Sequence, residues 1–294
     1  MNDKIQVTIV TPVHNEGDSI RHTLNEFFEF YQNSNFEVSF VVSEDGSSDN
    51  SVEEVKIVAE NHPVVLISEP VRKGYSKAVI DGLSEVNTPV VSFIDSDGQC
   101  HPKDLQNLYE KFDGDNLVIG YRNPRQDNFV RKTMSQAFKF VYERYFDLRL
   151  IDPSCPFFVT SIQNLKNILD TPDIGILKQG FWWEFYARAY SLGIEIVESP
   201  IEHRVRAAGE TVVYRPTKIP SIAYEHIKGL KTLKNTLKKL HKFKFLIDLK
   251  FIKINNNKSS TISKIKNSKY NSSIIHNNCG TPDCCGQCET AIKN

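Results

Sequence analysis

The first 120 residues alternate between short apolar runs and segments whose apolar residues recur with a helical period. The runs are rich in Val, Ile and Phe, which favour strands, and polar or glycine-containing stretches bound them. We therefore predict strands over residues 5–12, 36–43, 63–68, 89–94 and 116–120. The intervening segments predict helices over residues 17–32, 51–61, 74–86 and 102–112.

This alternation predicts the fold class. Strands that are joined through helices run parallel, and the helices cover both faces of the sheet. Burial on both faces explains why the strands are continuous apolar runs and do not alternate with polar residues. We predict an α/β fold with a mostly parallel sheet, and the content of 40% hydrophobic and 11% aromatic residues is ample for its core.

Charge divides the chain into an acidic body and a basic tail. Residues 218–278 contain 14 lysines and two acidic residues, whereas residues 1–217 contain 21 basic and 32 acidic ones. From residue 222 to 254, apolar side chains recur at helical spacing between the lysines. The recurring residues are Ile227, Leu230, Leu233, Leu237, Leu240, Phe243, Ile247 and Phe251.

A basic amphipathic helix of this kind either lies on an anionic membrane surface or packs on the body of the protein. We expect three parts: a body over residues 1–217, a basic helical segment over 218–254 and a disordered tail over 255–294. The tail ends in four cysteines within residues 279–288, for which metal binding, redox activity and plain disorder all remain open.

The sequence shows neither a signal peptide nor an apolar run of about 18 residues that could span a membrane. We expect a cytoplasmic protein that binds no nucleic acid, because aromatic residues are interleaved with the lysines over a short stretch alone.

Polar residues follow four consecutive predicted strands, at residues 14–18, 44–50, 69–74 and 95–99. Ligands bind at the carboxyl ends of the strands in such sheets, so the four loops together indicate a binding site. Caps for the following helices are the alternative explanation for each loop alone.

The loop "DSDGQ" places Asp95, Asp97 and Gln99 directly after a buried strand. Carboxylate and amide oxygens suit Mg²⁺ or Mn²⁺, which keep positions open for phosphate oxygens. The sequence contains neither a G-x-G-x-x-G after its first strand nor a P-loop, so a metal-bridged diphosphate is favoured. A helix cap with a solvated turn is the alternative.

The order of motifs resembles that of family 2 glycosyltransferases with a GT-A fold, and most closely the branch of dolichol-phosphate mannosyltransferases and other polyprenol-phosphate sugar transferases. The resemblance covers roughly residues 4–215. The motifs are "TPVHNE", "EDGSSDNS", "RKGYSKAVIDGL", "DSDGQCHP", "GYR" and "PIEHRVRAAGET".

The resemblance implies three groups of site residues. Those that would bind the nucleotide sugar are Pro12, Glu16, Asp45, Arg72, Lys73, Asp95 and Asp152. Those that would hold Mg²⁺ or Mn²⁺ are Asp95, Asp97 and Gln99. Those expected to act in catalysis, around the donor and acceptor phosphates, are Asp97, Arg122, Arg131 and Arg206. Surface charge is the alternative for Arg122 and Arg131.

Several positions depart from the family pattern. Glu44 stands where an aspartate is usual, His14 replaces an aromatic residue, and "DPSCPFF" after Ile151 lacks a glycine and an arginine. The Q-x-x-R-W of many polymerising members is absent, which favours transfer of a single sugar. In "GFWWEFYARA", we expect Trp182 and Trp183 in the core or near a lipid groove, and Glu184 either as a family acidic residue or in a structural ion pair.

The function that the resemblance implies is an inverting, metal-dependent transfer of one hexose, mannose or glucose. The donor would be GDP-mannose or UDP-glucose, and the acceptor a polyprenyl or dolichyl phosphate at the cytoplasmic membrane face, which the lysine-rich tail would contact. The alternatives are transfer to a soluble, protein-linked or lipid-linked glycan, and a non-catalytic nucleotide-binding protein.

Overall fold

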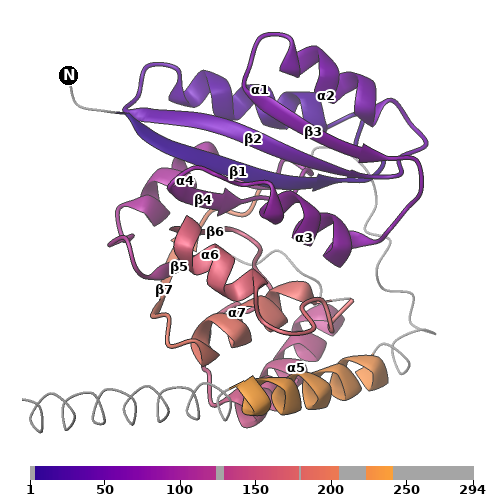
Figure 1. Cartoon of the computed structure of the whole chain (residues 1–294), viewed down its shortest axis with the longest axis vertical. Helices are drawn as coiled ribbons and strands as arrows, with labels where there is room; N and C mark the ends of the chain where they lie inside the picture. Colours follow the sequence, from indigo (N-terminus) through magenta and orange to yellow (C-terminus); the bar gives the residue numbers. More distant parts are fainter. Residues whose placement is uncertain (1–3, 124–128, 179, 205–222, 241–294) are drawn as a thin grey trace, which may run out of the picture. The chain divides into compact units, whose positions relative to one another are not determined.

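The computed structural model describes residues 4–123, 129–178, 180–204 and 223–240, with the backbone alone at 129–135 and 137 (Figure 1). By its internal contacts the chain divides into units of residues 1–241 and 242–294, and every described residue belongs to the first. The strands are β1 (Ile5–Val13), β2 (Phe36–Asp45), β3 (Val64–Glu69), β4 (Val90–Phe93), β5 (Leu117–Arg122), β6 (Phe158–Ser161) and β7 (Ile196–Ile201). The helices are α1 (Ile20–Tyr31), α2 (Ser51–Ala59), α3 (Tyr75–Ser84), α4 (Pro102–Tyr109), α5 (Phe129–Phe146), α6 (Ile162–Leu169) and α7 (Phe181–Ser191).

The strands form one sheet in the order β3-β2-β1-β4-β6-β5-β7. All neighbours run parallel except for β6, which is antiparallel to both β4 and β5. The five predicted strands and four predicted helices are present, and the mostly parallel α/β sheet is confirmed. What the sequence did not indicate is that β6 inserts between β4 and β5.

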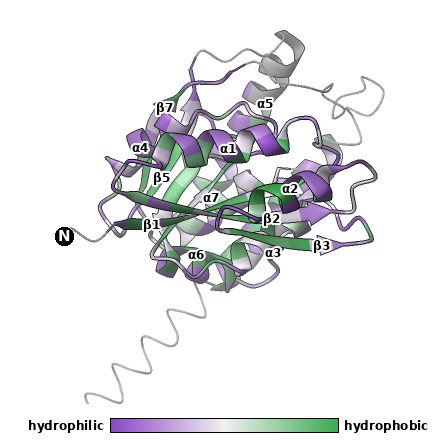
Figure 2. Ribbon diagram, turned by 90° about the horizontal axis from the view of Figure 1, so that it is seen from above, coloured by the Kyte–Doolittle hydropathy of each residue, from purple (hydrophilic) through white to green (hydrophobic). Residues whose placement is uncertain are grey.

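Two hydrophobic clusters fill the two faces of this sheet. Along β1, Val7 and Ile9 point into one cluster and Val10 into the other, as the alternation of side chains in a strand requires. The first cluster is covered by α1, α2 and α4, and the second by α3, α6 and α7. Figure 2 shows the apolar strands between helices whose outward sides are polar.

The basic segment is helical over residues 223–240 and packs on the body of the protein. Leu230, Leu233 and Leu237 are at most 5% exposed and belong to the same cluster as Trp183 of α7. The Lys234 ammonium lies 5.1 Å from the ring centre of Tyr145 on α5. The packed arrangement is therefore the one observed here, because these three leucines are covered by protein, although Ile227 on the same helix is 45% exposed.

The remaining expectations for the tail lie outside the described residues. These are the boundary at residue 217, the continuation of the helix to 254 and the four cysteines. Within the described ranges, we find no helix with both the length and the apolar character needed to cross a membrane.

Candidate functional site

Four parallel strands bring the predicted site loops to one edge of the sheet. In the register of the sheet, Val13 at the end of β1 lies beside Glu44 of β2, and Asp45 lies beside Glu69 of β3. The amide of Ile94 donates to the carbonyl of Val10, at 3.1 Å, and extends the pairing of β4 with β1. The loops after β1, β2, β3 and β4 therefore leave the sheet on the same side, as the sequence predicted.

The D-x-D-x-Q loop after β4 is supported from two directions. The hydroxyl groups of Ser19, at the N-cap of α1, and of Thr23 in α1 donate to the carbonyl of Ser96, at 3.2 and 3.4 Å. On the other side, the Gln99 amide nitrogen donates to the carbonyl of Arg204 at 2.9 Å, and the Arg204 amide donates to the carbonyl of Gln99 at 3.1 Å. The loop is thus fixed between α1 and the segment that follows β7.

The donor set of this loop fits a hard divalent cation. Asp95 and Asp97 supply carboxylates and are only partly buried. Because the nitrogen of the Gln99 side chain is engaged, its amide oxygen is the atom suited to a cation. The part of the chain that is described has no cluster of three His, Cys, Asp or Glu residues, so oxygen atoms of a ligand would complete the coordination.

Arg204 holds the far side of the same loop. Its guanidinium donates to both carboxylate oxygens of Glu26 on α1, at 2.8 and 3.1 Å, and to the carbonyl of Cys100. Such a bidentate ion pair fixes the orientation of the guanidinium as well as its position. The sequence analysis singled out neither Glu26 nor this role of Arg204, because the contact joins residues 178 positions apart.

Asp45 is buried and organises the "RKG" turn. Its carboxylate accepts hydrogen bonds from the amides of Lys73, at 2.6 Å, and Gly74, at 2.9 Å, and Arg72 lies 3.6 Å away. Gly74 adopts φ 92°, which an L side chain rarely does. Asp45 thus lies beside Arg72 and Lys73, and the contacts of all three with a nucleotide stay predictions.

The cations of this turn differ in exposure. The Arg72 side chain is 63% exposed and stands at the open edge of the sheet. The Lys73 ammonium instead points back to Asp81 of α3, at 2.7 Å, and Glu69, at 3.6 Å. Burial acts to lower the pKa of Lys73, but the Asp81 carboxylate outweighs burial and the pKa is raised. Arg72 is therefore the better placed of the two to meet a phosphate.

The loops after β1 and β2 bind each other. The Asn15 amide donates to the Ser47 hydroxyl at 3.0 Å, and the Gly17 amide donates to Asp49 at 3.0 Å. The Glu16 amide donates to the Ser51 hydroxyl at 2.9 Å. The predicted residue Pro12 lies in β1 and is buried. These hydrogen bonds therefore hold the two loops together at the edge of the sheet. The contact of Pro12 and Glu16 with a nucleotide stays a prediction.

Arg122 and Asp152 form a bidentate ion pair. The guanidinium donates to the two carboxylate oxygens at 2.6 and 2.9 Å and to the Ser154 hydroxyl at 2.6 Å. The two side chains are 10% and 4% exposed. The unusual "DPSCPFF" loop therefore holds Arg122 at the carboxyl end of β5, and surface charge alone does not describe this residue. Arg131 lies on α5 with an undescribed side chain, and Arg206 lies outside the described residues.

Tyr75 and Trp182 join the site, although the sequence analysis assigned neither to it. The Tyr75 hydroxyl, at the start of α3, donates to Asp95 at 3.0 Å, and the Trp182 indole donates to that hydroxyl at 2.9 Å. Burial of the hydroxyl and the charge of Asp95 raise the pKa of Tyr75 well above 10.0, so the phenol stays protonated. The available signal was a tyrosine at the start of a helix, directly after the polar loop that follows β3.

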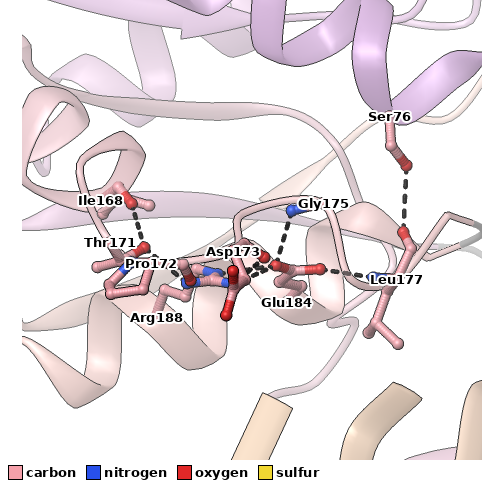
Figure 3. A network of polar contacts seen from close by, with 9 residues as sticks. All are labelled: Ser76, Ile168, Thr171, Pro172, Asp173, Gly175, Leu177, Glu184 and Arg188. Carbon is pink, nitrogen blue, oxygen red and sulfur yellow. Dashed lines mark hydrogen bonds and ion pairs between the residues drawn. The ribbon is translucent and has the colours of Figure 1, made fainter. Parts of the chain in front are cut away.

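Glu184 belongs to a structural ion pair (Figure 3). Its carboxylate accepts from Arg188, four residues on in α7, at 2.6 and 2.8 Å, and both side chains are 0% exposed. The same carboxylate accepts from the amides of Gly175 and Leu177, at 2.9 and 2.7 Å. Trp182 and Trp183 are buried in the core beside it, which confirms the expected core placement.

Cys100 and Cys155 are buried, and their thiols are free. Burial raises the pKa of Cys100 well above its ordinary value and that of Cys155 to about 12. Both thiols therefore stay protonated and serve as small apolar side chains.

Sequence comparison identifies a relative over most of the chain. The chain is 25% identical over 233 residues to the undecaprenyl-phosphate 4-deoxy-4-formamido-L-arabinose transferase of Edwardsiella ictaluri (strain 93-146). That alignment covers 77% of this chain and 68% of the relative.

Two solved structures of the glucosyl-3-phosphoglycerate synthase of Mycobacterium tuberculosis share the fold. One is a complex with Mn²⁺, UDP and glucosyl-3-phosphoglycerate, with a TM-score of 0.58 and 17% identity, and covers 78% of this chain and 80% of that one. The other is a complex with Mg²⁺ and UDP, with a TM-score of 0.58 and 17% identity, and covers 78% and 79%. The fold is therefore the GT-A fold that the motifs implied.

The model of the family "Glycosyl transferase family 2" matches residues 8–167, which are more than half of the chain. The matched range includes the loops after β1, β2, β3 and β4 and the Arg122–Asp152 pair. The chain thus belongs to glycosyl transferase family 2 and is a glycosyltransferase.

Proposed function

We propose that this glycosyltransferase moves one hexose from GDP-mannose or UDP-glucose to a polyprenyl phosphate, with inversion at the anomeric carbon. The observation that carries the proposal is the D-x-D-x-Q loop, whose Asp95, Asp97 and Gln99 stand at the sheet edge between two fixed supports. The relative from Edwardsiella ictaluri, which is named for transfer to undecaprenyl phosphate, supports the acceptor class.

Asp95, Asp97 and Gln99 would hold Mg²⁺ or Mn²⁺ on the donor's diphosphate. The bound cation would act as a Lewis acid that stabilises negative charge on the leaving diphosphate. The complexes of the synthase with Mn²⁺ or Mg²⁺ and UDP support this use of a cation.

The residues around the loop suit a reaction between two anions. An acceptor phosphate is already negative at neutral pH, so the site needs no strong general base. Its task is to bring acceptor and donor together and to stabilise the diphosphate as charge builds there. Arg72 is exposed at the sheet edge, and Arg122 is held in a fixed orientation by Asp152. Arginine stays charged and can bind phosphate in a fork, which suits Arg72, whereas the fork of Arg122 is engaged by Asp152 and this residue would contribute its positive charge.

The test is transfer of labelled sugar into lipid. The full chain is incubated with radiolabelled GDP-mannose or UDP-glucose, Mg²⁺ or Mn²⁺ and a short polyprenyl phosphate, and label is counted in the organic phase. We expect metal-dependent labelling with one donor, and a loss of about 10²-fold or more in Asp97→Asn. Asp115→Asn is the matched control, because Asp115 is exposed at the opposite end of β5.

The remaining outcomes separate the alternatives. Label in 3-phosphoglycerate or a glycan, with none in lipid, would show a different acceptor. Metal-dependent binding of UDP or GDP without any transfer would support the non-catalytic alternative. Absence of nucleotide binding would refute the proposed donor.

We further propose that the exposed lysines of residues 223–240 meet an anionic membrane on the cytoplasmic side. Leu230, Leu233 and Leu237 of this helix are buried and Ile227 is 45% exposed, so the attraction would be mainly electrostatic, at about 1 kcal/mol for each lysine near the surface. Removing the helix would uncover the core around Trp183, so charge variants are the better test. The lysines concerned are Lys228, Lys231, Lys238 and Lys239.

The membrane test uses sedimentation of the full chain with phosphatidylcholine vesicles that contain or lack phosphatidylglycerol. We expect binding to anionic vesicles that falls with salt and is weakened when the four lysines become Gln. The control changes four lysines that are exposed on other elements: Lys56, Lys103, Lys111 and Lys166. An equal loss of vesicle binding in both variants would show that the lysines of this helix contribute no more than other surface lysines.

A further inference from the structure

We propose that Tyr75 is a positioning residue for Asp95, and that Trp182 in turn holds Tyr75. The inference rests on the proposed metal-dependent transfer and adds to it two residues of this chain. It says that the carboxylate of the D-x-D loop is oriented by a chain of two hydrogen bonds, which runs from the hydrophobic core to the edge of the sheet.

The chemistry of the three groups fixes the direction of this chain. An indole N–H can only donate, so the Tyr75 hydroxyl oxygen accepts from Trp182 at 2.9 Å. The single proton of the hydroxyl is then available for Asp95, whose Oδ1 accepts it at 3.0 Å. A hydrogen bond to an ionised carboxylate is among the stronger ones in proteins. Tyr75 therefore favours one orientation of the Asp95 side chain.

Trp182 is a rigid support for the Tyr75 hydroxyl. It is 4% exposed, and its ring packs against Phe93 of β4, with ring centres 4.4 Å apart, and against Phe158 of β6, at 5.6 Å. Phe93 precedes Asp95 by two residues in the chain. The indole is therefore fixed to the strand that leads into the D-x-D loop, and its N–H direction is set by core packing.

The backbone beside Tyr75 is fixed separately. The hydroxyl of Ser76 donates to the carbonyls of Leu177 and Lys178, at 3.1 and 2.9 Å. The Leu177 amide donates to Glu184, and Figure 3 shows this route from Ser76 to the Glu184–Arg188 pair. The first turn of α3 is thus tied to α7 both through Tyr75 and through Ser76.

The consequence concerns the cation. Asp95 lies two residues after the end of β4, where its side chain is partly exposed. A carboxylate held in one orientation before binding loses less conformational freedom when a cation arrives. Removing the Tyr75 hydroxyl should therefore weaken cation binding, even though the carboxylate itself is unchanged.

The experiment measures Mn²⁺ binding by the full chain from the electron paramagnetic resonance signal of free Mn²⁺, with UDP or GDP present. For Tyr75→Phe we expect the Mn²⁺ dissociation constant to rise about 3–10-fold, the usual effect of having to order one more side chain on binding. Trp182→Phe should raise it less. The double variant should match Tyr75→Phe alone, because Trp182 acts through the hydroxyl that Tyr75→Phe removes.

Tyr142→Phe is the matched control. Tyr142, which unlike Tyr75 is fully buried, also uses its hydroxyl as a donor, at 2.9 Å to the carbonyl of Trp183 on α7, next to Trp182. We expect it to lower stability without changing Mn²⁺ affinity. Thermal melts of each variant confirm folding, and Tyr75, at 37% exposed, is the safer site should Trp182→Phe unfold the chain.

Three outcomes would overturn the inference. Mn²⁺ affinity that is unchanged or higher in Tyr75→Phe would show that the hydroxyl does not position Asp95. Additive losses in the double variant would show that Trp182 acts through packing alone. If the unsubstituted chain bound UDP or GDP but bound no Mn²⁺, the metal site of the proposed function would itself be refuted, together with this inference.

Discussion

Replacing Glu184 by Gln tests the buried ion pair of α7. The two oxygens of the Glu184 carboxylate accept from Gly175, Leu177 and two nitrogens of Arg188, at distances of 2.6 to 2.9 Å. An amide offers one oxygen and one nitrogen, so in either orientation its N–H₂ group faces an N–H donor. The change also leaves the Arg188 charge in the interior without a counter-charge.

The expected loss of stability follows from burial. Both side chains are 0% exposed, and removal of one partner from a buried pair costs about 3–5 kcal/mol. Arg188 keeps its bonds to the Thr171 hydroxyl and to the carbonyls of Pro172 and Asp173, at 2.7 to 2.9 Å, which limits the loss. A loss of about 4 kcal/mol corresponds to a Tm lower by roughly 8–16 °C in a domain of this size.

Urea unfolding of the full chain, followed by circular dichroism, measures this loss. Glu143→Gln is the control, because it makes the same change in an (i, i+4) pair on α5, with Lys139 3.9 Å away and side chains 29% and 33% exposed. We expect the control to lose less than about 1 kcal/mol. A loss below about 1 kcal/mol in Glu184→Gln would refute the argument from burial.

Two further predictions concern the sheet and its edge. A Cβ on Gly82 would lie 2.7 Å from Val10 Cγ1 and 3.2 Å from Ser43 Cβ. Gly82→Ala should therefore lower the free energy of unfolding in urea by about 1–3 kcal/mol, despite the better helix propensity of alanine. Stability equal to that of the parent would contradict this crowding. Burial acts to raise the pKa of Asp49, but hydrogen bonds from Ser51 and Gly17 outweigh it and lower the pKa below the ordinary 3.8. The stabilisation from Asp49 is therefore present above pH 3.8 and is lost as the pH falls below that value. In Asp49→Asn, the free energy of unfolding should consequently fall less steeply on the acid side of its pH profile. An unaltered acid side would contradict the lowered pKa.

The strands and helices of the first 120 residues could be predicted because each carries its own local signal. A buried parallel strand is an apolar run, as in β1, where residues 7–13 are all buried. β6 was not predicted, because it is only four residues long and its pairing with β4 and β5 depends on residues far away in the chain.

The site was predictable where its residues share one loop. Asp95, Asp97 and Gln99 lie within five residues, and their order alone indicated a cation site. The ion pair that fixes Arg122 could not be predicted in this way, because its two residues do not share a loop. Asp152 was expected at the site on family resemblance, but its bidentate bond with Arg122 spans 30 residues and follows from the approach of the "DPSCPFF" loop to β5.

The sequence by itself determined the α/β alternation, the position of the polar loops at the strand ends and the family, since these depend on local periodicity and on short motifs. Tertiary structure alone decided which side chains meet. It placed Trp182 and Tyr75 beside Asp95, paired Glu26 with Arg204, and buried the leucines of residues 223–240 against the protein. Local patterns show which face of an element is apolar, but what covers that face depends on how distant segments pack.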